Sequence, residues 1–314
     1  MSKVAVLGAT GGIGNAVIQE LANRGHEVTA VSRRADARAP TGVKTLAADL
    51  GDQAQAVVAC AGAEVAVMAA QVPYHQWADQ LGPMIQNVLE GAAQAGARLV
   101  MVDNLYAYGS PGTPISESTP EAATTRKGAI RRDIGQRLLL AHREGVAPVT
   151  IGRFNDYYGP GGTNSLLYIL GIEPALRGKA PRALINPDQS HTFNYLPDTA
   201  WAFATLVERP ESEGRVWILP APPPITQREL MTLVTDAVGL PPRVGRVTPL
   251  MLTLAGLFKP QIRELRELAE QWGRPYTTDA SAFQSAFGSP ELTPHQKAVP
   301  DTVAWFRERR TTGR

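Results

Sequence analysis

The chain has 314 residues, of which 44% are hydrophobic and 19% are charged, as in an ordinary globular protein with one large or two modest domains. Its 31 Lys and Arg residues nearly balance 29 Asp and Glu residues, and no basic cluster alternates with aromatic residues. Nucleic acid is therefore not an expected partner. A single cysteine, Cys60, excludes an internal disulfide framework and fits a reducing compartment.

No membrane partner and no metal are expected. The longest apolar run, residues 250–258, is far shorter than the roughly 20 residues that cross a bilayer. The N-terminus enters a predicted strand directly, without a charged leader, so we expect a cytoplasmic location. The five His residues and the one Cys show no metal-ligand spacing.

The first half of the chain alternates short apolar runs with helical patterns. Helices are expected over residues 14–24, in a segment that ends near Gly96, and around TTRKGAIRRD (124–133). This alternation predicts βαβ units and a Rossmann-type doubly wound parallel sheet. The expected strands are 3–8, 26–32, 43–50, 64–70, 98–104 and 148–154.

The rhythm breaks at the glycine- and proline-rich segment YYGPGGTN (157–164) and resumes at 191–207 and 215–220. From Ile225 onward the pattern is mainly helical, over 228–238, 251–258 and 262–272. We therefore expect a Rossmann domain and a smaller, mostly helical lobe. The Rossmann domain would comprise 1–155 and 190–224, and the lobe 156–189 and 225–314.

A glycine-rich turn, VLGATGGIG, follows the first predicted strand and opens the first helix. Gly8 would allow the tight turn, Gly11 would let a pyrophosphate approach the backbone, and Gly14 would permit close packing of helix on strand. A helix N-terminus adds free N–H groups and a positive dipole end. The turn predicts a dinucleotide site that also includes Thr10, Gly12 and Ile13.

The second predicted strand ends in Ser32, Arg33 and Arg34, where an acidic residue would bind the ribose diol of NAD. Guanidinium groups pair with a 2′-phosphate, so the sequence favours NADP(H) as the cofactor. Further cofactor contacts are expected after the third and fourth strands, although each has a structural alternative: Asp49 could cap a helix, and small residues suit any tightly packed sheet. These expected contacts are Asp49, Leu50, Ala69 and Ala70.

Four segments together carry a family resemblance: VLGATGGIG, DNLYAYG, RFNDYYGPGG and FNYLPDTAWAF. With a helical C-terminal lobe, they resemble the extended short-chain dehydrogenase/reductases of the NAD-dependent epimerase/dehydratase type. The resemblance implies a Rossmann domain that binds the cofactor and a C-terminal lobe that closes over the substrate.

The resemblance also implies a Ser or Thr after the fifth strand and a Tyr-x-x-x-Lys motif on the next helix. In this chain Asn104 stands at the Ser position. One register of the helix puts Lys127 in place of the Tyr and Arg131 in place of the Lys, whereas the next gives Gly128 and Arg132. Neither register contains a phenol.

A rebuilt catalytic site is one interpretation. Asn104 and Tyr106 are two residues apart at a strand end, which would point both side chains to one face. Tyr106 would then bring the replacement phenol, and Lys127 or Arg131 would lower its pKa or bind the nicotinamide ribose. The alternative is that Tyr106 is a packing residue and that TTRKGAIRRD is a solvated helix face.

Substrate contacts are expected from Tyr157 and Tyr158, which follow the sixth strand, and from His191, although a lone His is often structural. Our leading hypothesis is a NADP(H)-dependent oxidoreductase acting on a small carbonyl, hydroxyl or activated alkene compound with a non-standard proton donor. The alternatives are a non-catalytic NADP(H)-binding sensor or regulatory protein and a nucleotide-sugar epimerase/dehydratase.

The resemblance implies dimers formed by the helices before and after the fifth strand. Because a two-fold interface sets a patch against itself, cations on the second helix would repel each other. We therefore expect a monomer or an unusual homodimer. The cations are Arg126, Lys127, Arg131 and Arg132.

Overall fold

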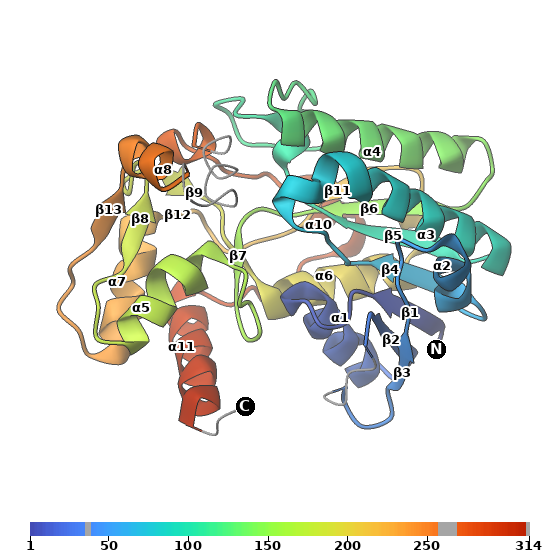
Figure 1. Ribbon diagram of the computed structural model, residues 1–314, viewed down its shortest axis with the longest axis horizontal. Coiled ribbons are helices and arrows are strands. Elements are labelled where there is room, and N and C mark those ends of the chain that lie inside the picture. Colours follow the sequence, from blue (N-terminus) through green and yellow to red (C-terminus); the bar gives the residue numbers. More distant parts are fainter. Residues whose placement is uncertain (35–38, 257–268, 312–314) are drawn as a thin grey trace.

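The computed structural model describes residues 1–34, 39–256 and 269–311. Within these ranges, seven parallel strands form one sheet in the order β11-β6-β5-β4-β1-β2-β3 (Figure 1). This confirms the predicted Rossmann-type sheet. The strands are β1 (Lys3–Leu7), β2 (Glu27–Ser32), β3 (Lys44–Ala47), β4 (Val65–Met68), β5 (Arg98–Asp103), β6 (Val149–Arg153) and β11 (Val216–Ile218).

Helices cover both faces of the sheet, and its central strands are therefore buried on both sides. Strand β4 is buried at every position, as expected for an apolar run inside a parallel sheet. One face packs against α2 (Gln53–Cys60), α3 (Gly82–Ala95) and α4 (Arg126–Arg143). The other packs against α1 (Gly12–Asn23), α6 (Leu196–Glu208) and α10 (Ser281–Phe287).

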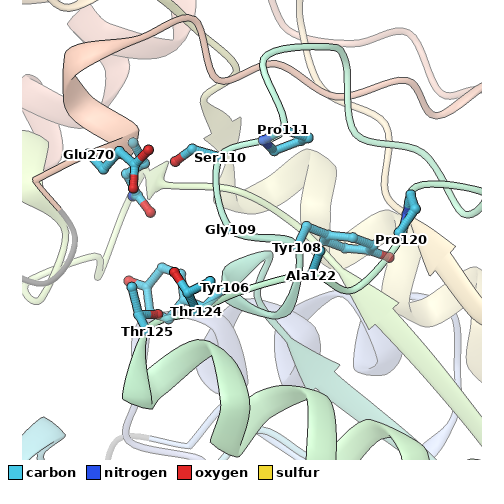
Figure 2. A pocket seen from close by; sticks show the side chains of 11 residues that line it. Tyr106, Tyr108, Gly109, Ser110, Pro111, Pro120, Ala122, Thr124, Thr125 and Glu270 are labelled. Atoms are coloured by element: carbon cyan, nitrogen blue, oxygen red, sulfur yellow. The ribbon is translucent and has the colours of Figure 1, made fainter.

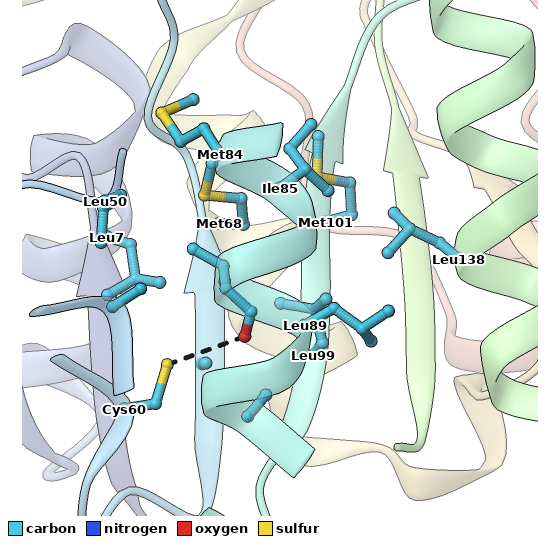
Figure 3. Packing of buried hydrophobic residues seen from close by; sticks show 14 of the residues in the cluster. Leu7, Leu50, Cys60, Met68, Met84, Ile85, Leu89, Leu99, Met101 and Leu138 are labelled. Carbon is cyan, nitrogen blue, oxygen red and sulfur yellow. Dashed lines mark hydrogen bonds between the residues drawn. The ribbon is translucent and has the colours of Figure 1, made fainter. Parts of the chain in front are cut away.

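Cys60 lies in the core between α2, α3 and the sheet (Figure 3). Its Sγ is 4.0 Å from the carbonyl oxygen of Val88. Burial raises the pKa of the thiol to about 11, so the group stays protonated at neutral pH and packs as a small apolar residue.

The smaller lobe has its own core, which includes Trp272 and Phe306. It contains helices α5 (Glu173–Leu176), α7 (Gln227–Val238), α8 (Pro249–Gly256) and α11 (His295–Thr311). Among the described residues it also contains short strand pairs that the sequence did not predict. These pairs are β7 (Tyr157–Tyr158) with β10 (Asn194–Tyr195), β8 (Arg182–Leu184) with β13 (Gly245–Val247), and β9 (Ser190–His191) with β12 (Ile225–Thr226).

Short helical turns connect these elements. They are the 3₁₀ helices η1 (Tyr74–Gln76), η3 (Tyr106–Tyr108), η5 (Pro210–Ser212) and η7 (Gln271–Gly273), and the π-helical turns η2 (Trp77–Leu81) and η4 (Leu167–Ile172). Most of the helix expected over 262–272 lies outside the described residues, and its end forms η7.

The packing differs in two places from the expected division into Rossmann domain and lobe. Phe283 and Phe287 of α10, expected in the lobe, contact the Trp217 ring of β11 at centroid distances of 6.3 and 4.6 Å. Conversely, Phe193 and Tyr195, expected in the Rossmann domain, belong to the lobe's core. The chain therefore crosses between the two parts more often than the sequence pattern indicates.

In the described part of the chain, no helix is long and apolar enough to span a membrane. The same residues bring together no group of three His, Cys, Asp or Glu side chains that could hold a metal ion.

Candidate active site

Two glycines of the turn after β1 are required by packing. Gly8 has a φ of +103°, and a Cβ there would lie 2.5 Å from the backbone nitrogen of Ala70 at the end of β4. A Cβ on Gly14 would lie 2.3 Å from the Gly8 carbonyl oxygen. The first glycine thus lets neighbouring strand ends approach, and the second lets α1 pack on the turn, as the sequence predicts.

Gly11 has a different environment. A Cβ there would meet only the Gly8 oxygen, at 3.4 Å, so its outer side is open. Gly11 is also the N-cap of α1 and provides no side-chain cap, so the first N–H groups of the helix remain available to an anion. This open cradle fits a pyrophosphate. Ile13 is buried beneath the turn, and Thr10 is exposed beside it.

A second glycine-rich segment closes over the turn. A Cβ on Gly12 would lie 3.0 Å from the carbonyl oxygen of Gly161 and 3.2 Å from the Cα of Gly162. The YYGPGGTN segment, which begins the smaller lobe, therefore contacts the cofactor turn backbone to backbone.

At the end of β2, Arg33 and Arg34 are exposed, and the Ser32 hydroxyl donates a hydrogen bond to the Arg34 carbonyl oxygen. Both guanidinium groups are thus accessible to a ligand at this edge. Leu50 and Ala69, which follow β3 and β4, are buried.

The geometry excludes one of the two interpretations of Asp49, that of a helix cap. Its carboxylate accepts a hydrogen bond from the Gly51 N–H at 3.0 Å, in a turn after β3. The N-cap of α2 is Asp52, which accepts from the Gln55 N–H at 3.0 Å. Asp49 is therefore not the helix cap, and it is exposed.

The chain after β5 departs from the expected geometry. The strand ends at Asp103, and the side-chain oxygen of Asn104 accepts the Tyr106 N–H at 3.0 Å. This hydrogen bond turns the chain into η3. The expectation that Asn104 and Tyr106 share a strand face is therefore wrong, because Asn at such a position bonds its own backbone two residues on.

Tyr106 still contributes a phenol at the carboxyl edge of the sheet. Its hydroxyl lies 2.9 Å from the hydroxyl of Tyr74, which comes from η1 after β4. Trp77 packs against both rings, at centroid distances of 5.0 Å from Tyr74 and 6.1 Å from Tyr106. Burial, followed by the charges of Tyr74 and Asp156, raises the pKa of Tyr106 well above its ordinary value. The phenol is therefore protonated at neutral pH.

The inner face of α4 carries two buried cations. Lys127 and Arg131, one helical turn apart, are only 2% and 1% exposed. The Lys127 Nζ lies 5.6 Å from the centre of the Tyr74 ring. The interpretation of this segment as a wholly solvated face is wrong for these two residues. The burial of these two cations also weakens the expected repulsion between paired α4 helices. Of the four cations on which that expectation rested, only Arg126, which is exposed, and Arg132, which is half-buried, remain at the surface.

Gly128 explains how α4 comes so close to η3. A Cβ there would lie 2.3 Å from the Ala123 Cβ and 2.6 Å from the Tyr106 carbonyl oxygen. Two registers were possible for aligning α4 with the family's Tyr-x-x-x-Lys motif. In the register that aligns Lys127 with the Tyr and Arg131 with the Lys, both side chains are buried on the inner face of the helix. Gly128 serves the contact between backbones.

Arg131 is engaged in an ionic cluster beneath the phenols. Its guanidinium lies 3.1 Å from Asp103, donates to the Gln71 side-chain oxygen at 2.6 Å, and stacks 4.2 Å from the Trp77 ring centre. Arg153 of β6 binds Asp103 from the other side at 2.9 Å, and also binds Glu121. Breaking such a buried cluster typically costs about 3–5 kcal/mol. Arg131 is thus held by Asp103, whereas the Lys127 ammonium group lies over the Tyr74 ring.

Asp156, in the loop after β6, is a candidate site residue in addition to those expected from the sequence. Its Oδ2 is buried and has no hydrogen-bond partner among the described residues. Burial raises the pKa of this carboxyl to about 7, and its charge in turn raises the pKa of Tyr74 and of Tyr106. Tyr74, Tyr106 and Asp156 follow the adjacent strands β4, β5 and β6, whose carboxyl ends meet at one edge.

The expected substrate residues lie in different surroundings. Burial raises the pKa of Tyr157 to about 12, and the centre of its ring lies 5.9 Å from that of Phe154. Tyr158 is fully buried in the lobe, and its hydroxyl oxygen lies 2.7 Å from the His295 Nδ1. His191 is buried, and its ring stacks on that of Trp272 with the ring centres 4.5 Å apart. Burial lowers the pKa of His191 to about 4.

A cleft of about 330 Å³ opens beside Tyr106 (Figure 2). Thr124 and Thr125, at the start of α4, lie next to Tyr106, whereas Tyr108 points away toward Pro120. Glu270 reaches the cleft from the C-terminal part of the chain, so both parts of the molecule line it. Tyr157, Tyr158 and His191 are not among the described residues that line this cleft.

The glycine turn and the parallel sheet, with polar groups at its carboxyl edge, define a Rossmann-type protein of the extended short-chain dehydrogenase/reductase class. Residues 4–219 match the model of the NAD dependent epimerase/dehydratase family, and the chain belongs to this family. A search of curated protein sequences returned no match.

Solved structures share the fold over nearly the whole chain. A double mutant of DesIV, a dTDP-glucose 4,6-dehydratase from Streptomyces venezuelae with NAD and DAU bound, is 18% identical with a TM-score of 0.81, over 99% of this chain and 98% of that one. PA4631, a nucleoside-diphosphate-sugar epimerase from Pseudomonas aeruginosa, is 18% identical with a TM-score of 0.80, over 98% of each chain. MoeE5 in complex with UDP-glucose and NAD is 22% identical with a TM-score of 0.79, over 98% of this chain and 99% of that one.

Proposed function

We propose that the chain is a NADP(H)-dependent oxidoreductase that acts on a small carbonyl, hydroxyl or activated alkene compound, with Tyr106 as its proton donor. The observation that carries this proposal is the Tyr74–Tyr106 hydroxyl pair, 2.9 Å apart, at the carboxyl edge of the sheet beside buried Lys127. In such a pair one hydroxyl donates to the other, which leaves one phenolic proton for a third group. A substrate oxygen in the adjacent cleft is a suitable acceptor.

The chain's residues fit a nicotinamide dinucleotide, and the solved structures with NAD bound support this class of cofactor. When bound, the cofactor would supply hydride chemistry. The open side of Gly11 would hold its pyrophosphate, exposed Arg33 and Arg34 its 2′-phosphate, and Lys127 its nicotinamide ribose. The preference for NADP(H) rests on the two arginines.

Tyr106 is suited to the acid role in a reduction. Its raised pKa keeps the phenol neutral throughout the physiological range, as a donor of a proton must be. Asn104 holds the Tyr106 backbone through its 3.0 Å hydrogen bond, so its part is to position the phenol.

The test is consumption of NADPH by the purified chain over a panel of small carbonyl compounds and activated alkenes. The proposal predicts turnover with at least one member of the panel and a large loss of it in Tyr106→Phe. Turnover that survives this substitution unchanged would assign the proton to another group.

A nucleotide-sugar epimerase or dehydratase is the second candidate, favoured by what the solved relatives act on or bind. Such a reaction would convert UDP-glucose or dTDP-glucose without net consumption of cofactor, and NMR of the products would detect it. Tight NADPH binding with no conversion of either substrate group would instead favour a sensor or regulatory protein.

A further inference from the structure

Two buried glutamines of the smaller lobe use their side chains differently. Gln227, at the start of α7, is 4% exposed, and its amide bonds at both ends. Its oxygen accepts the Leu184 N–H at 2.8 Å, and its nitrogen donates to the Leu184 carbonyl oxygen at 2.9 Å. Gln271, at the start of η7, is 6% exposed, but its Nε2 has no hydrogen-bond partner among the described residues. Gln227 therefore joins α7 to β8, whereas the amide nitrogen of Gln271 joins nothing.

The place of Gln271 in the fold gives its amide a use. Leaving a buried donor unpartnered is costly, and an apolar side chain of similar shape would avoid that cost. Gln271 lines the cleft beside Tyr106, together with Thr124 and Glu270 (Figure 2). The terminal torsion of a glutamine is broad, so the amide can turn toward a ligand in the cleft. Its nitrogen donates and its oxygen accepts, so the group suits a carbonyl or hydroxyl oxygen.

The backbone around Gln271 is fixed on the side of the smaller lobe. Trp272, the next residue, is 2% exposed in the lobe's core, and its carbonyl oxygen accepts the Asn186 N–H at 3.3 Å. The Gly273 N–H donates to the Glu270 carbonyl oxygen at 3.0 Å and closes the turn around Gln271. The start of the side chain is therefore well positioned before a ligand binds.

The same segment is tied to the Rossmann part close to Tyr106. The Tyr276 hydroxyl donates to the carbonyl oxygen of Leu105, the residue before Tyr106, at 3.2 Å. The Thr277 carbonyl oxygen accepts the Ile115 N–H at 2.8 Å. These bonds hold the segment that carries Gln271 in a fixed place relative to Tyr106. A substrate in the cleft would then meet the phenol from one part of the molecule and the amide from the other.

We propose that Gln271 determines substrate specificity by hydrogen-bonding a second oxygen of the substrate, while Tyr106 donates to the carbonyl oxygen that is reduced. The favoured substrates are hydroxy-carbonyl and dicarbonyl compounds, because an analogue without the second oxygen leaves the amide unpaired. In the reduction the C=O π bond breaks, the carbon gains a hydride from NADPH, which becomes NADP⁺, and the oxygen gains the Tyr106 proton, which solvent replaces. Gln271 transfers no proton. This inference rests on the proposed function and names its substrate class.

The test compares carbonyl compounds that differ in one oxygen. The pairs are diacetyl with butanone and hydroxyacetone with acetone, and kcat/KM is measured from NADPH consumption by the wild type and Gln271→Met. Comparing the ratio within each pair between proteins cancels the intrinsic reactivity of the compounds. The wild type is expected to favour the compound with the second oxygen, and this preference is expected to fall at least about 10-fold in Gln271→Met. Tyr106→Phe is expected to slow both members of a pair alike.

Thermal unfolding gives a readout that needs no substrate. Methionine leaves no unpartnered amide behind, so Gln271→Met is expected to unfold at a temperature no lower than that of the wild type. Gln227→Met is the matched control, because it breaks the hydrogen bonds to Leu184. It is expected to lower the unfolding temperature by at least about 2 °C and to leave the substrate ratio unaltered.

The outcomes separate this inference from the proposed function. Destabilisation of Gln271→Met like that of Gln227→Met, or an unaltered preference for the second oxygen in Gln271→Met, would overturn the role of Gln271 alone. The same conclusion would follow if the wild type reduced other carbonyl compounds or alkenes but not diacetyl or hydroxyacetone. Absence of NADPH consumption with every compound would overturn the proposed function, and the role of Gln271 with it.

Discussion

The hydroxyl oxygens of Tyr74 and Tyr106 lie 2.9 Å apart, although the two residues follow different strands and are 32 positions apart in the chain. Strands β4 and β5 are neighbours in the parallel sheet, so the segments after them meet at one edge. With Lys127 on the inner face of α4, this pair gives the edge a half-buried phenol donor close to a buried cation.

Gly11→Val and Gly14→Val should separate binding from folding. At Gly11 a Cβ meets only the Gly8 oxygen at 3.4 Å, so Gly11→Val should fold and lose the thermal shift that NADPH produces, because the side chain occupies pyrophosphate space. At Gly14 a Cβ would approach the same oxygen to 2.3 Å, so Gly14→Val should be destabilised by at least about 2 kcal/mol. An undiminished NADPH shift in a folded Gly11→Val protein would contradict the assignment of this turn.

Arg33→Asp should reverse the preference between the two nicotinamide cofactors. Loss of a charge-assisted contact to the 2′-phosphate should weaken NADPH binding about 10- to 150-fold, while NADH gains a partner for its ribose diol. Titration calorimetry with both cofactors measures the ratio. Lys179→Asp, an equal change of charge on an exposed residue of the smaller lobe, should leave it unaltered. Equal affinities for NADPH and NADH in the wild type would argue against a 2′-phosphate site here.

Lys127→Met should lower both NADPH affinity and turnover, because the buried ammonium group lies against the Tyr74 ring, where we place the nicotinamide ribose. The expected loss is about 10-fold or more in each quantity. Arg126→Met, an exposed cation one residue earlier, is the matched control and should behave as the wild type. Full affinity and rate in a folded Lys127→Met protein would return this residue to a packing role.

Asp156 should make the chain less stable as the pH rises. Because its folded-state pKa of about 7 exceeds the ordinary value of 3.8, the folded protein binds more protons than the unfolded chain between these two values. Its contribution is therefore full below about pH 4 and is lost as the pH rises to about 7, by up to about 4 kcal/mol. Denaturation of the wild type and Asp156→Asn at about pH 5 and about pH 8 measures this. The variant should gain stability relative to the wild type at the higher pH, and a pH-independent difference would refute the raised pKa.

The parts of the fold that depend on local pattern could be predicted from the sequence. Alternating apolar runs specified the parallel sheet, and the spacing of Gly8, Gly11 and Gly14 placed the turn after β1, because period and backbone freedom are local properties. The strand pairs of the smaller lobe were missed, since each strand is too short to show a period.

The catalytic edge was only partly predictable. Tyr106 was identified, but a single Asn104 hydrogen bond turned its backbone out of the strand. Tyr74 gave no signal, because its importance arises from a contact between two loops. The inward direction of Lys127 and Arg131 depends on the close approach of Gly128 to η3, which only the tertiary structure reveals. The carboxyl end of β6 offered the one available hint for Asp156.

The most direct test of the account is single-turnover oxidation of NADPH by wild type and Tyr106→Phe, with any carbonyl or alkene compound that the wild type reduces. Tyr168→Phe, whose ring stacks on Phe306 in the smaller lobe, is the control. The account predicts a rate lower by about 10²- to 10⁴-fold in Tyr106→Phe, with NADPH affinity within about 2-fold of the wild type and the control unaffected. An undiminished rate in Tyr106→Phe would contradict it.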